Sequence, residues 1–278
     1  MMIFLILFLF ISMFLPLFVL VMESFQIVPG KGYSLNNLSL YAWIGKIENA
    51  PNPAFAQDGL FRNSEFGRAT WNTIKLSVLG SLITAICGQF FGYVTTRGRG
   101  RWYGKWTEQM IFIPYLMPGV AFSAIYFAMF SRPRLGGVIP SLYGTFALIL
   151  LCSIVKHFPF ASRSGSSNMM QISVELEEAA DLAGASFWKR IGKIVIPLAK
   201  GGFVSGFLLS FISIAKELDL IALLMTPANY TLSFLSFDYS KEAMPQVADA
   251  ICIVIIIFIL IGNKIAGKLG GEVSKSMG

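Results

Sequence analysis

Charged side chains inside an apolar run are the first candidates for function. Lys216, Glu217 and Asp219 lie towards the end of such a run, at residues 201–225. Burying an ionised group costs free energy unless the group is paired or faces a polar space. In a helix, Lys216 and Asp219 would share a face and neutralise each other. The other interpretation is that Glu217 or Asp219 lines a polar pathway, where a carboxylate suits a cation and the nearby Lys216 reduces that attraction.

Metal and redox chemistry has few candidate residues. The chain has one histidine, His157, and three cysteines that lie far apart within apolar runs, Cys87, Cys152 and Cys252. So few ligands predict no zinc, haem or iron–sulfur site. We expect His157 to lie at the membrane interface, at the inner end of the fourth span, and the cysteines to pack as small apolar side chains. No group of a histidine with acids indicates catalysis, so we expect no catalytic residue, no metal and no cofactor.

A polar segment at residues 157–200 has the pattern of two short helices joined by a tight turn. Ser173 is a good helix N-cap, and the acids that follow it fall in a first turn, where the helix dipole favours them. Gly184 is typical of a helix end, and Ser186 is typical of a new helix start. Pro197 is expected to end the second helix.

The first of these helices has the composition of a docking surface. Ala179, Ala180 and Gly184 leave a surface of low relief, where the backbone of another protein can approach closely. Acids such as Glu178 beside that surface can pair with arginines of a partner. The alternative is a hairpin that lies on a bilayer.

Composition decides the environment of these segments. Hydrophobic residues make up 55% of the 278 residues and charged residues 13%, and the mean hydropathy is +0.67. Soluble domains carry roughly 25% charged residues, so a soluble enzyme and a disordered chain are excluded. The chain is expected to be an all-α polytopic membrane protein. The net charge of +7 is then typical of basic cytoplasmic loops, and we expect no nucleic-acid partner.

Six apolar runs predict about six transmembrane helices. They are residues 2–22, 76–94, 109–130, 141–155, 201–225 and 247–262. The expected organisation is a first helix at 1–22, a periplasmic loop and interfacial segment at 23–75, a core of five helices at 76–266 that includes a cytoplasmic loop at 157–200, and a cytoplasmic tail at 267–278. The first run lacks a basic start and a cleavage site, which favours a membrane helix over a cleaved signal peptide.

Small residues and prolines add detail to two spans. Gly80, Thr84, Gly88 and Gly92 recur every fourth residue, so another helix can approach that face closely. Pro114 and Pro118 predict a bent or discontinuous third span, because each removes a helical hydrogen bond.

The basic residues predict the orientation of the spans. Lys and Arg are more frequent in residues 97–106, 156–200 and the tail than in the other loops, which places these segments and both termini in the cytoplasm. Lys216 lies roughly 24 Å from Lys200 along a helix. The charged residues at 216–219 are therefore expected in the outer half of the membrane.

The docking segment resembles a known family. Glu178-Ala179-Ala180, Gly184 three residues later, and Ile194-Val195-Ile196-Pro197 after nine more residues are similar to the EAA loop of ATP-binding-cassette (ABC) importer permeases. Ile196 stands where the family pattern has Leu. The resemblance extends from about Trp71 to the C-terminus. Trp71-Asn72-Thr73, Pro114-Tyr115-x-x-Pro118-Gly119 and Lys216-Glu217-Leu218 are similar to the ferric-iron branch, with thiamine, polyamine and phosphonate permeases nearby.

The resemblance implies the type I importer fold, a bacterial inner-membrane location and a set of partners. Two permease halves form the pathway, so the second half is another copy of this chain or a separate chain. A cytoplasmic ATPase dimer docks on the EAA loop, and a periplasmic or lipid-anchored binding protein delivers the solute. The chain has no G-x-x-x-x-G-K-S/T phosphate loop, so ATP hydrolysis is assigned to the partner and the chain is expected not to be an enzyme.

Roles for individual residues follow from the same resemblance. The ATPase-coupling residues are Glu178, Ala179, Ala180, Gly184, Ile194 and Pro197. The pathway residues are Lys216, Glu217, Asp219, Pro114 and Pro118. Ferric iron is the expected solute, and thiamine, a polyamine, a phosphonate or a sugar is the alternative. An ATP-independent channel or secondary transporter is the competing class, which the coupling pattern disfavours. A membrane enzyme would need a convergent polar site that the sequence lacks.

Overall fold

The computed structural model describes residues 1–53, 55–133, 137 and 140–275, with side chains as far as residue 268. This part of the chain is helical, and its β-structure is an isolated antiparallel bridge between Gln26 and Leu38. The expectation of an all-α protein is confirmed. The chain divides into two compact units, residues 1–73 with 226–258 and residues 74–225 with 259–278. Two long helices, α3 (Ser64–Arg97) and α12 (Pro245–Lys275), cross the boundary between the units.

Four helices are long and apolar enough to cross a membrane: α1 (Met2–Glu23), α3, α6 (Phe146–Met169) and the part of α12 from Pro245 to Lys268. Two bent pairs raise this number to six if each pair counts as one span. The first pair is α4 (Trp102–Leu116) with α5 (Gly119–Phe130), and the second is the segment Phe187–Leu198 with α10 (Lys200–Ala215). The expectation of about six spans is the upper end of this range.

The first unit contains α1, the polar segment after it, α11 (Leu232–Lys241) and parts of the two long helices. The polar segment has short turns of helix, including α2 (Tyr41–Ile44), as expected for a loop with little regular structure. The side chain of Asn63 donates to the hydroxyl of Tyr239, which in turn donates to Oε1 of Gln57 over 3.1 Å. Burial raises the pKa of Tyr239 to about 12.

The second unit is built on close contacts between helices. A Cβ atom added at Gly88 would lie 2.6 Å from the backbone of Ala161, and one added at Gly92 would lie 2.5 Å from that of Gly165. Real Cβ atoms do not approach so closely, and therefore α3 and α6 touch backbone to backbone. The expected small-residue contact face of α3 is confirmed, and α6 supplies small residues opposite it.

The structure also corrects the ends of several elements. The fourth span was expected at residues 141–155, with a loop from 157, but α6 begins at Phe146 and continues to Met169. Its last turns contain several serines and Gly165, which are typical of a loop, and here Ala161 and Gly165 pack against the glycines of α3. His157 therefore lies within a helix, not at the end of one, and is 3% exposed.

Three other helices differ from their expected bounds. The segment Trp71 to Lys75 is part of α3, which starts earlier because Oδ1 of Asn63 accepts from the N–H of Glu65 over 2.8 Å. The expected loop before the last span contains α11, and α12 continues into the expected tail. The helix expected at 201–225 ends at Ala215, and turns follow it.

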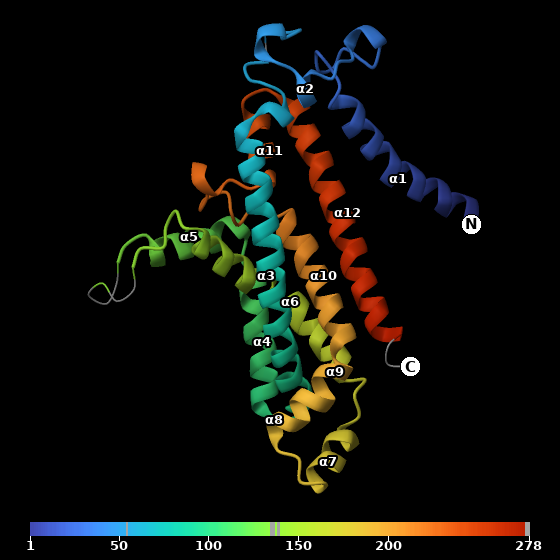
Figure 1. The fold of residues 1–278 in the computed structure, drawn as a ribbon, viewed down its shortest axis with the longest axis vertical. Coiled ribbons are helices and arrows are strands. Elements are labelled where there is room, and N and C mark those ends of the chain that lie inside the picture. The colour runs from blue at the N-terminus through green and yellow to red at the C-terminus, as the bar shows by residue number, and fades with distance from the viewer. Residues whose placement is uncertain (54, 134–136, 138–139, 276–278) are drawn as a thin grey trace. The chain divides into compact units, whose positions relative to one another are not determined.

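The predicted break in the third span is confirmed. Pro114 lies within α4, Pro118 is the residue before α5, and the two helices differ in direction by 99°. Figure 1 shows α5 turning away from the line of α4. Proline cannot donate a helical hydrogen bond, which explains why the chain changes direction at Pro118.

Candidate functional site

The segment after α6 forms the expected pair of short helices. Helix α7 (Val174–Leu182) starts at Ser173, whose hydroxyl accepts from the N–H of Glu175 over 3.2 Å. The N–H of Ala185 donates back to the carbonyl of Ala180 over 2.9 Å, which closes the helix end. Gly184 has a φ of +75°, a conformation that glycine adopts without strain. Helix α8 (Phe187–Arg190) follows, and together α7, the turn and α8 form what we call the docking hairpin, residues 173–190.

The docking hairpin presents small and apolar side chains to the outside of the unit. Glu178 and Ala179 are exposed and Ala180 is half-buried. Leu182 is 92% exposed and Trp188 is 75% exposed. Large apolar side chains with this exposure are typical of a protein contact surface. Figure 1 shows α7 at the end of the helices of its unit, beyond α4 and α9.

Glu177 fixes the hairpin to α3. Its Oε1 accepts from Nε of Arg97 over 2.8 Å, and its Oε2 accepts from the hydroxyl of Tyr93 over 2.8 Å. Arg97 also donates to the carbonyl of Ile172 over 3.2 Å. The carboxylate of Glu177 is buried. Neighbouring acids of α7 therefore have different positions: Glu177 faces the helices of the unit and Glu178 faces outwards.

Sequence reasoning missed the role of Glu177. It treated Glu177 only as an acid favoured by the helix dipole, and Arg97 only as one of several loop cations. The available signal was the period of the helix. Glu178 lies one residue, or about 100°, round the helix from Glu177, so the two acids cannot share a face.

The second half of the loop connects the hairpin to α10. A π-helical turn, Ile191–Val195, joins α8 to α9 (Ile196–Leu198), and the segment as a whole meets α10 at 66°. Ile191 and Val195 pack in a small core with Met169 of α6. Ile194 and Pro197, two expected coupling residues, are both half-buried. Pro197 lies within α9, next to the bend and not at the end of a free helix.

A second cluster lies just beyond α10. The carboxylate of Glu217 accepts from Nζ of Lys156 over 2.9 Å and lies 3.1 Å from Nε2 of His157. The same carboxylate accepts from the N–H of Leu220 over 3.1 Å. The three side chains are 11%, 12% and 4% exposed for Glu217, Lys156 and His157. A carboxylate with these two side-chain partners connects α6 to the turns that follow α10.

The two ring nitrogens of His157 both lie close to hydrogen-bond acceptors. Its Nδ1 lies 2.8 Å from the carbonyl oxygen of Ser153, and its Nε2 faces the carboxylate of Glu217. Both neighbours are hydrogen-bond acceptors, so a neutral imidazole can satisfy only one of them.

The expected pairing of Lys216 with Asp219 is wrong. Both follow the end of α10, so they share no helix face, and both are exposed. In the described part of the chain, no ion pair within 4.0 Å includes either of them. The partner of the buried carboxylate is Lys156, which sequence reasoning had placed in the cytoplasmic loop.

A cavity of about 400 Å³ brings most of the expected pathway residues together. Its walls include Lys216, Glu217 and Asp219, together with Lys156 and His157. The proline break borders the same region, because a Cβ atom added at Gly119 would lie 2.7 Å from Cβ of Asp219 and 2.8 Å from Nζ of Lys156.

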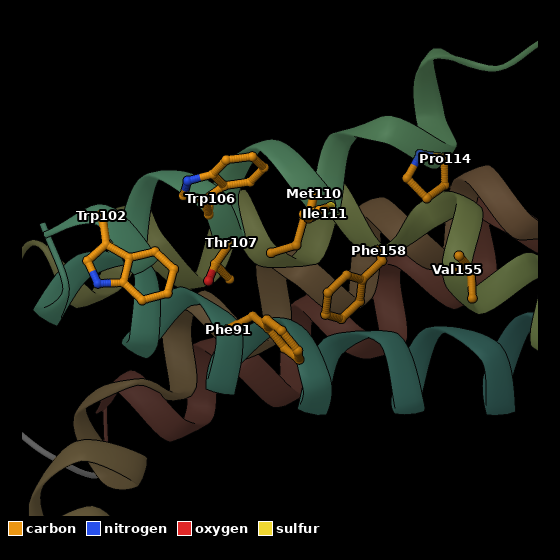
Figure 2. A pocket seen from close by; sticks show the side chains of 9 residues that line it. All are labelled: Phe91, Trp102, Trp106, Thr107, Met110, Ile111, Pro114, Val155 and Phe158. Atoms are coloured by element: carbon orange, nitrogen blue, oxygen red, sulfur yellow. The ribbon is translucent and has the colours of Figure 1, made fainter.

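Pro114 is separate from this cavity. It lines an apolar groove with Trp102, Trp106, Met110 and Phe158, as Figure 2 shows. Among the described residues, no three His, Cys, Asp or Glu side chains are close enough to hold a metal ion.

Comparison with known proteins decides what these features belong to. The family model described as "Binding-protein-dependent transport system inner membrane component" matches residues 88–267, which include the docking hairpin and the charged cluster at Glu217. The chain belongs to this family. It is therefore a multi-pass inner-membrane permease of the ABC importer type.

Relatives of this permease differ in the solutes that their names give. The Fe(3+)-transport system permease protein FbpB 2 of Haemophilus influenzae is 24% identical over 197 residues, which are 70% of this chain and 37% of that protein. The chain thus spans little more than a third of that relative. A putative 2-aminoethylphosphonate permease protein, PhnV, of Salmonella paratyphi A is 25% identical over 73% of this chain and 77% of that protein. The trehalose permease SugB of Mycobacterium tuberculosis is 28% identical over 77% and 80% of the two chains.

Solved structures support the fold. A bacterial alginate ABC transporter in complex with an alginate-bound periplasmic protein aligns with a TM-score of 0.73 at 18% identity, over 99% of this chain and 94% of that chain. The methionine ABC transporter MetNI, in an inward-facing conformation, aligns with a TM-score of 0.61 at 16% identity, over 74% and 95% of the two chains. The permease fold expected from the sequence is confirmed.

Proposed function

We propose that this permease is the transmembrane subunit of an ATP-driven importer and that the docking hairpin is its contact with a cytoplasmic ATPase dimer. The observation that carries this proposal is the combination of an exposed, low-relief helix with a buried anchor. Glu178, Ala179 and Leu182 are open to a partner, while Glu177 holds the same helix to Arg97. A surface that is both accessible and fixed can transmit a force.

The anchors suggest how movement of an ATPase reaches the membrane helices. Glu177 connects α7 to the end of α3, and Asp181 of α7 accepts from Nη1 of Arg190 over 3.0 Å. The helical segment after α8 packs on α6 and continues to the bend before α10. Displacement of α7 would therefore act on α3, α6 and α10 together instead of bending a flexible loop. Ile194 and Pro197 serve as the link to α10.

Other partners complete the proposal. A second permease half, either another copy of this chain or a separate chain, forms the other wall of the pathway. A periplasmic or lipid-anchored binding protein delivers the solute on the outer side. ATP hydrolysis takes place in the ATPase, and membrane lipids surround α1, whose side chains from Met1 to Leu17 are exposed in this chain.

Ferric iron is the proposed solute, and the resemblance to a ferric-iron permease supports it. The phosphonate and trehalose relatives make a phosphonate or a sugar an alternative solute. Thiamine and a polyamine are further alternatives. The cavity beside Glu217 and Asp219 is the proposed position of the pathway. Its open charges are Lys216 and Asp219, since Glu217 already has cationic partners.

An uptake assay tests the function and the solute together. Proteoliposomes would contain this permease, its ATPase and its second half, with the binding protein outside. We expect ATP-dependent uptake of radiolabelled ferric iron, and little uptake of 2-aminoethylphosphonate, trehalose, thiamine or putrescine. Uptake of another of these solutes would correct the substrate alone. Uptake of any solute without ATP and without the ATPase would contradict the importer proposal.

The orientation of the loops can be measured separately. Ala56 and Ala183 are exposed, and replacing each with Cys changes little volume. In a background without Cys87, Cys152 and Cys252, we expect an impermeant thiol reagent added to intact cells to label Ala56→Cys but not Ala183→Cys. Both should react after the membrane is opened. Labelling of Ala183→Cys in intact cells would show that the proposed cytoplasmic side is wrong.

A further inference from the structure

A basic cavity at the corner between α3 and α4 is unrelated to the docking hairpin and to the charged cluster at Glu217. Its volume is about 520 Å³. Three elements contribute cations to its wall: Arg99 follows α3, Lys105 lies in α4 and Arg163 lies in α6. Among the described residues that line it, the only acid is the exposed Glu108.

These three cations have no acidic partner in the described part of the chain. No carboxylate oxygen there lies within 4.0 Å of a nitrogen atom of Arg99, Lys105 or Arg163. By contrast, Arg97 pairs with Glu177 and Arg190 pairs with Asp181. Positive charge that converges on one cavity and stays unneutralised favours an anionic ligand.

The other groups in the wall suit phosphate oxygens. Thr95, Thr96, Ser166 and Ser167 line the cavity beside the cations. The hydroxyls of Thr95 and Ser166 bond to each other over 2.8 Å, and the hydroxyl of Thr96 donates to the carbonyl of Ser166 over 3.3 Å. The guanidinium of Arg163 lies 4.6 Å from the centre of the Phe112 ring, which orders it. Arginine and hydroxyl donors together are typical of phosphate recognition.

The surroundings place this cavity at the edge of the membrane. Trp102 and Trp106, in the first two turns of α4, are 76% and 56% exposed. They line the apolar groove of about 520 Å³ that continues along α4 to Pro114, which Figure 2 shows. Exposed tryptophans mark the headgroup level of a bilayer, and the groove marks the hydrocarbon side. A phosphate at this level belongs to a lipid more readily than to a solute.

We propose that this cavity binds the headgroup phosphate of an acidic phospholipid. Arg99, Lys105 and Arg163 neutralise the phosphate, and the hydroxyl of Ser167 donates a hydrogen bond to one of its oxygens. The acyl chains remain on the side of the exposed apolar residues of α4. Basic pockets between membrane helices bind acidic headgroups in the same way. The lipid would thus hold together α3, α4 and α6, whose ends form the corner.

Native mass spectrometry of the full chain in detergent tests this proposal without any transport partner. The probes are phosphatidylglycerol as the acidic lipid, phosphatidylcholine as the neutral lipid and glycerol 3-phosphate as a soluble phosphate. We expect retention of phosphatidylglycerol in preference to phosphatidylcholine. Millimolar glycerol 3-phosphate should not displace the lipid, because it lacks acyl chains.

Two double variants distinguish lipid binding at this cavity from a non-specific effect of positive charge. Arg99→Gln with Lys105→Gln removes two exposed cations from the cavity, and Lys264→Gln with Lys268→Gln removes two exposed cations from α12. Each cation near a membrane surface strengthens the binding of an acidic lipid roughly 5-fold. Removal of the first pair therefore predicts roughly 20- to 30-fold weaker phosphatidylglycerol binding. The second pair should bind like the native chain. Arg163→Gln alone should weaken binding by roughly 5-fold or more.

Several results would overturn the proposal. Native-like lipid binding by Arg99→Gln with Lys105→Gln is one, provided that the variant elutes as the native chain does in gel filtration. Equal loss in the Lys264 and Lys268 variant would show a non-specific charge effect. Displacement by glycerol 3-phosphate would assign the cavity to a soluble phosphate. None of these results depends on the ATPase or on transport, so the proposed function is tested independently.

Discussion

Gly184→Asp is expected to give a permease that inserts into the membrane but no longer retains its ATPase or transports. Gly184 has a φ of +75° and is exposed in the turn of the docking hairpin. Aspartate there adds backbone strain and a negative charge at the C-terminal end of α7, where the helix dipole disfavours it. In the proposed interface the carboxylate would also be desolvated without a partner. A cost of about 3 kcal/mol weakens binding by roughly 100-fold.

The measurement is co-purification of the ATPase in detergent, together with ATP-driven uptake in liposomes. Gly184→Ala is the first control, because it adds the strain but not the charge, and we expect a smaller loss. Gly67→Asp is the second control, since Gly67 is exposed and has open space around it, far along α3 from the hairpin. Glu178→Ala should weaken docking less than Gly184→Asp, because it removes one member of a proposed ion pair without adding bulk.

Normal ATPase retention and normal uptake by Gly184→Asp would contradict the coupling role of the hairpin. Loss of docking in Gly67→Asp as well would show that the assay detects general damage. The proposal requires a loss that is confined to the hairpin.

Glu217→Gln is expected to reduce the stability of the permease itself. The substitution leaves Lys156 without its counter-charge at a site where its side chain is only 12% exposed. Removing one partner of a buried ion pair costs about 3–5 kcal/mol, because the remaining charge is uncompensated. Thermal unfolding in detergent should show a clearly lower midpoint, and less folded protein should be recovered from membranes.

A double substitution tests whether the lost stability comes from the unpaired charge or from altered packing at the site. Lys156→Met with Glu217→Met removes both charges and fills the space with apolar side chains, so we expect it to regain most of the lost stability. Asp219→Asn is the matched control, because Asp219 is exposed and removal of its charge should change the free energy of unfolding by about 0.5 kcal/mol or less. If Asp219 lines the pathway, this variant should instead reduce uptake per folded complex.

Equal stability of Glu217→Gln and the native chain would show that Glu217 is not a structural anchor. A double variant that is less stable than Glu217→Gln would show that packing, and not charge, holds the site together.

Local sequence was enough to predict the membrane class, the break at Pro118 and the shape of the docking hairpin. These features depend on interactions within a few residues. An apolar run needs no partner to be recognised, a proline lacks its hydrogen-bond donor in any context, and Ser173 and Gly184 act on the ends of their own helix. The repeated glycines of α3 likewise indicated a close helix contact, although not which helix makes it.

Tertiary contacts decided the rest. Residues 157–169 are polar enough to resemble a loop, but Ala161 and Gly165 meet the glycines of α3, and this packing continues α6 to Met169. Helix propensity of such residues is low, and contacts with a distant segment compensate for it. No local pattern contains that information.

Charge pairing shows the same division. From the sequence alone, Lys216 was the nearest partner for the acids beyond α10, because neighbours in a chain are the only neighbours that a sequence displays. In the folded unit, α10 ends at Ala215, and Glu217 pairs with Lys156, which is 61 residues away in the chain. The sequence by itself determined which residues carry charge into the apolar part of this protein. Only the tertiary structure decided which of those charges neutralise each other, because desolvation selects partners by distance in space.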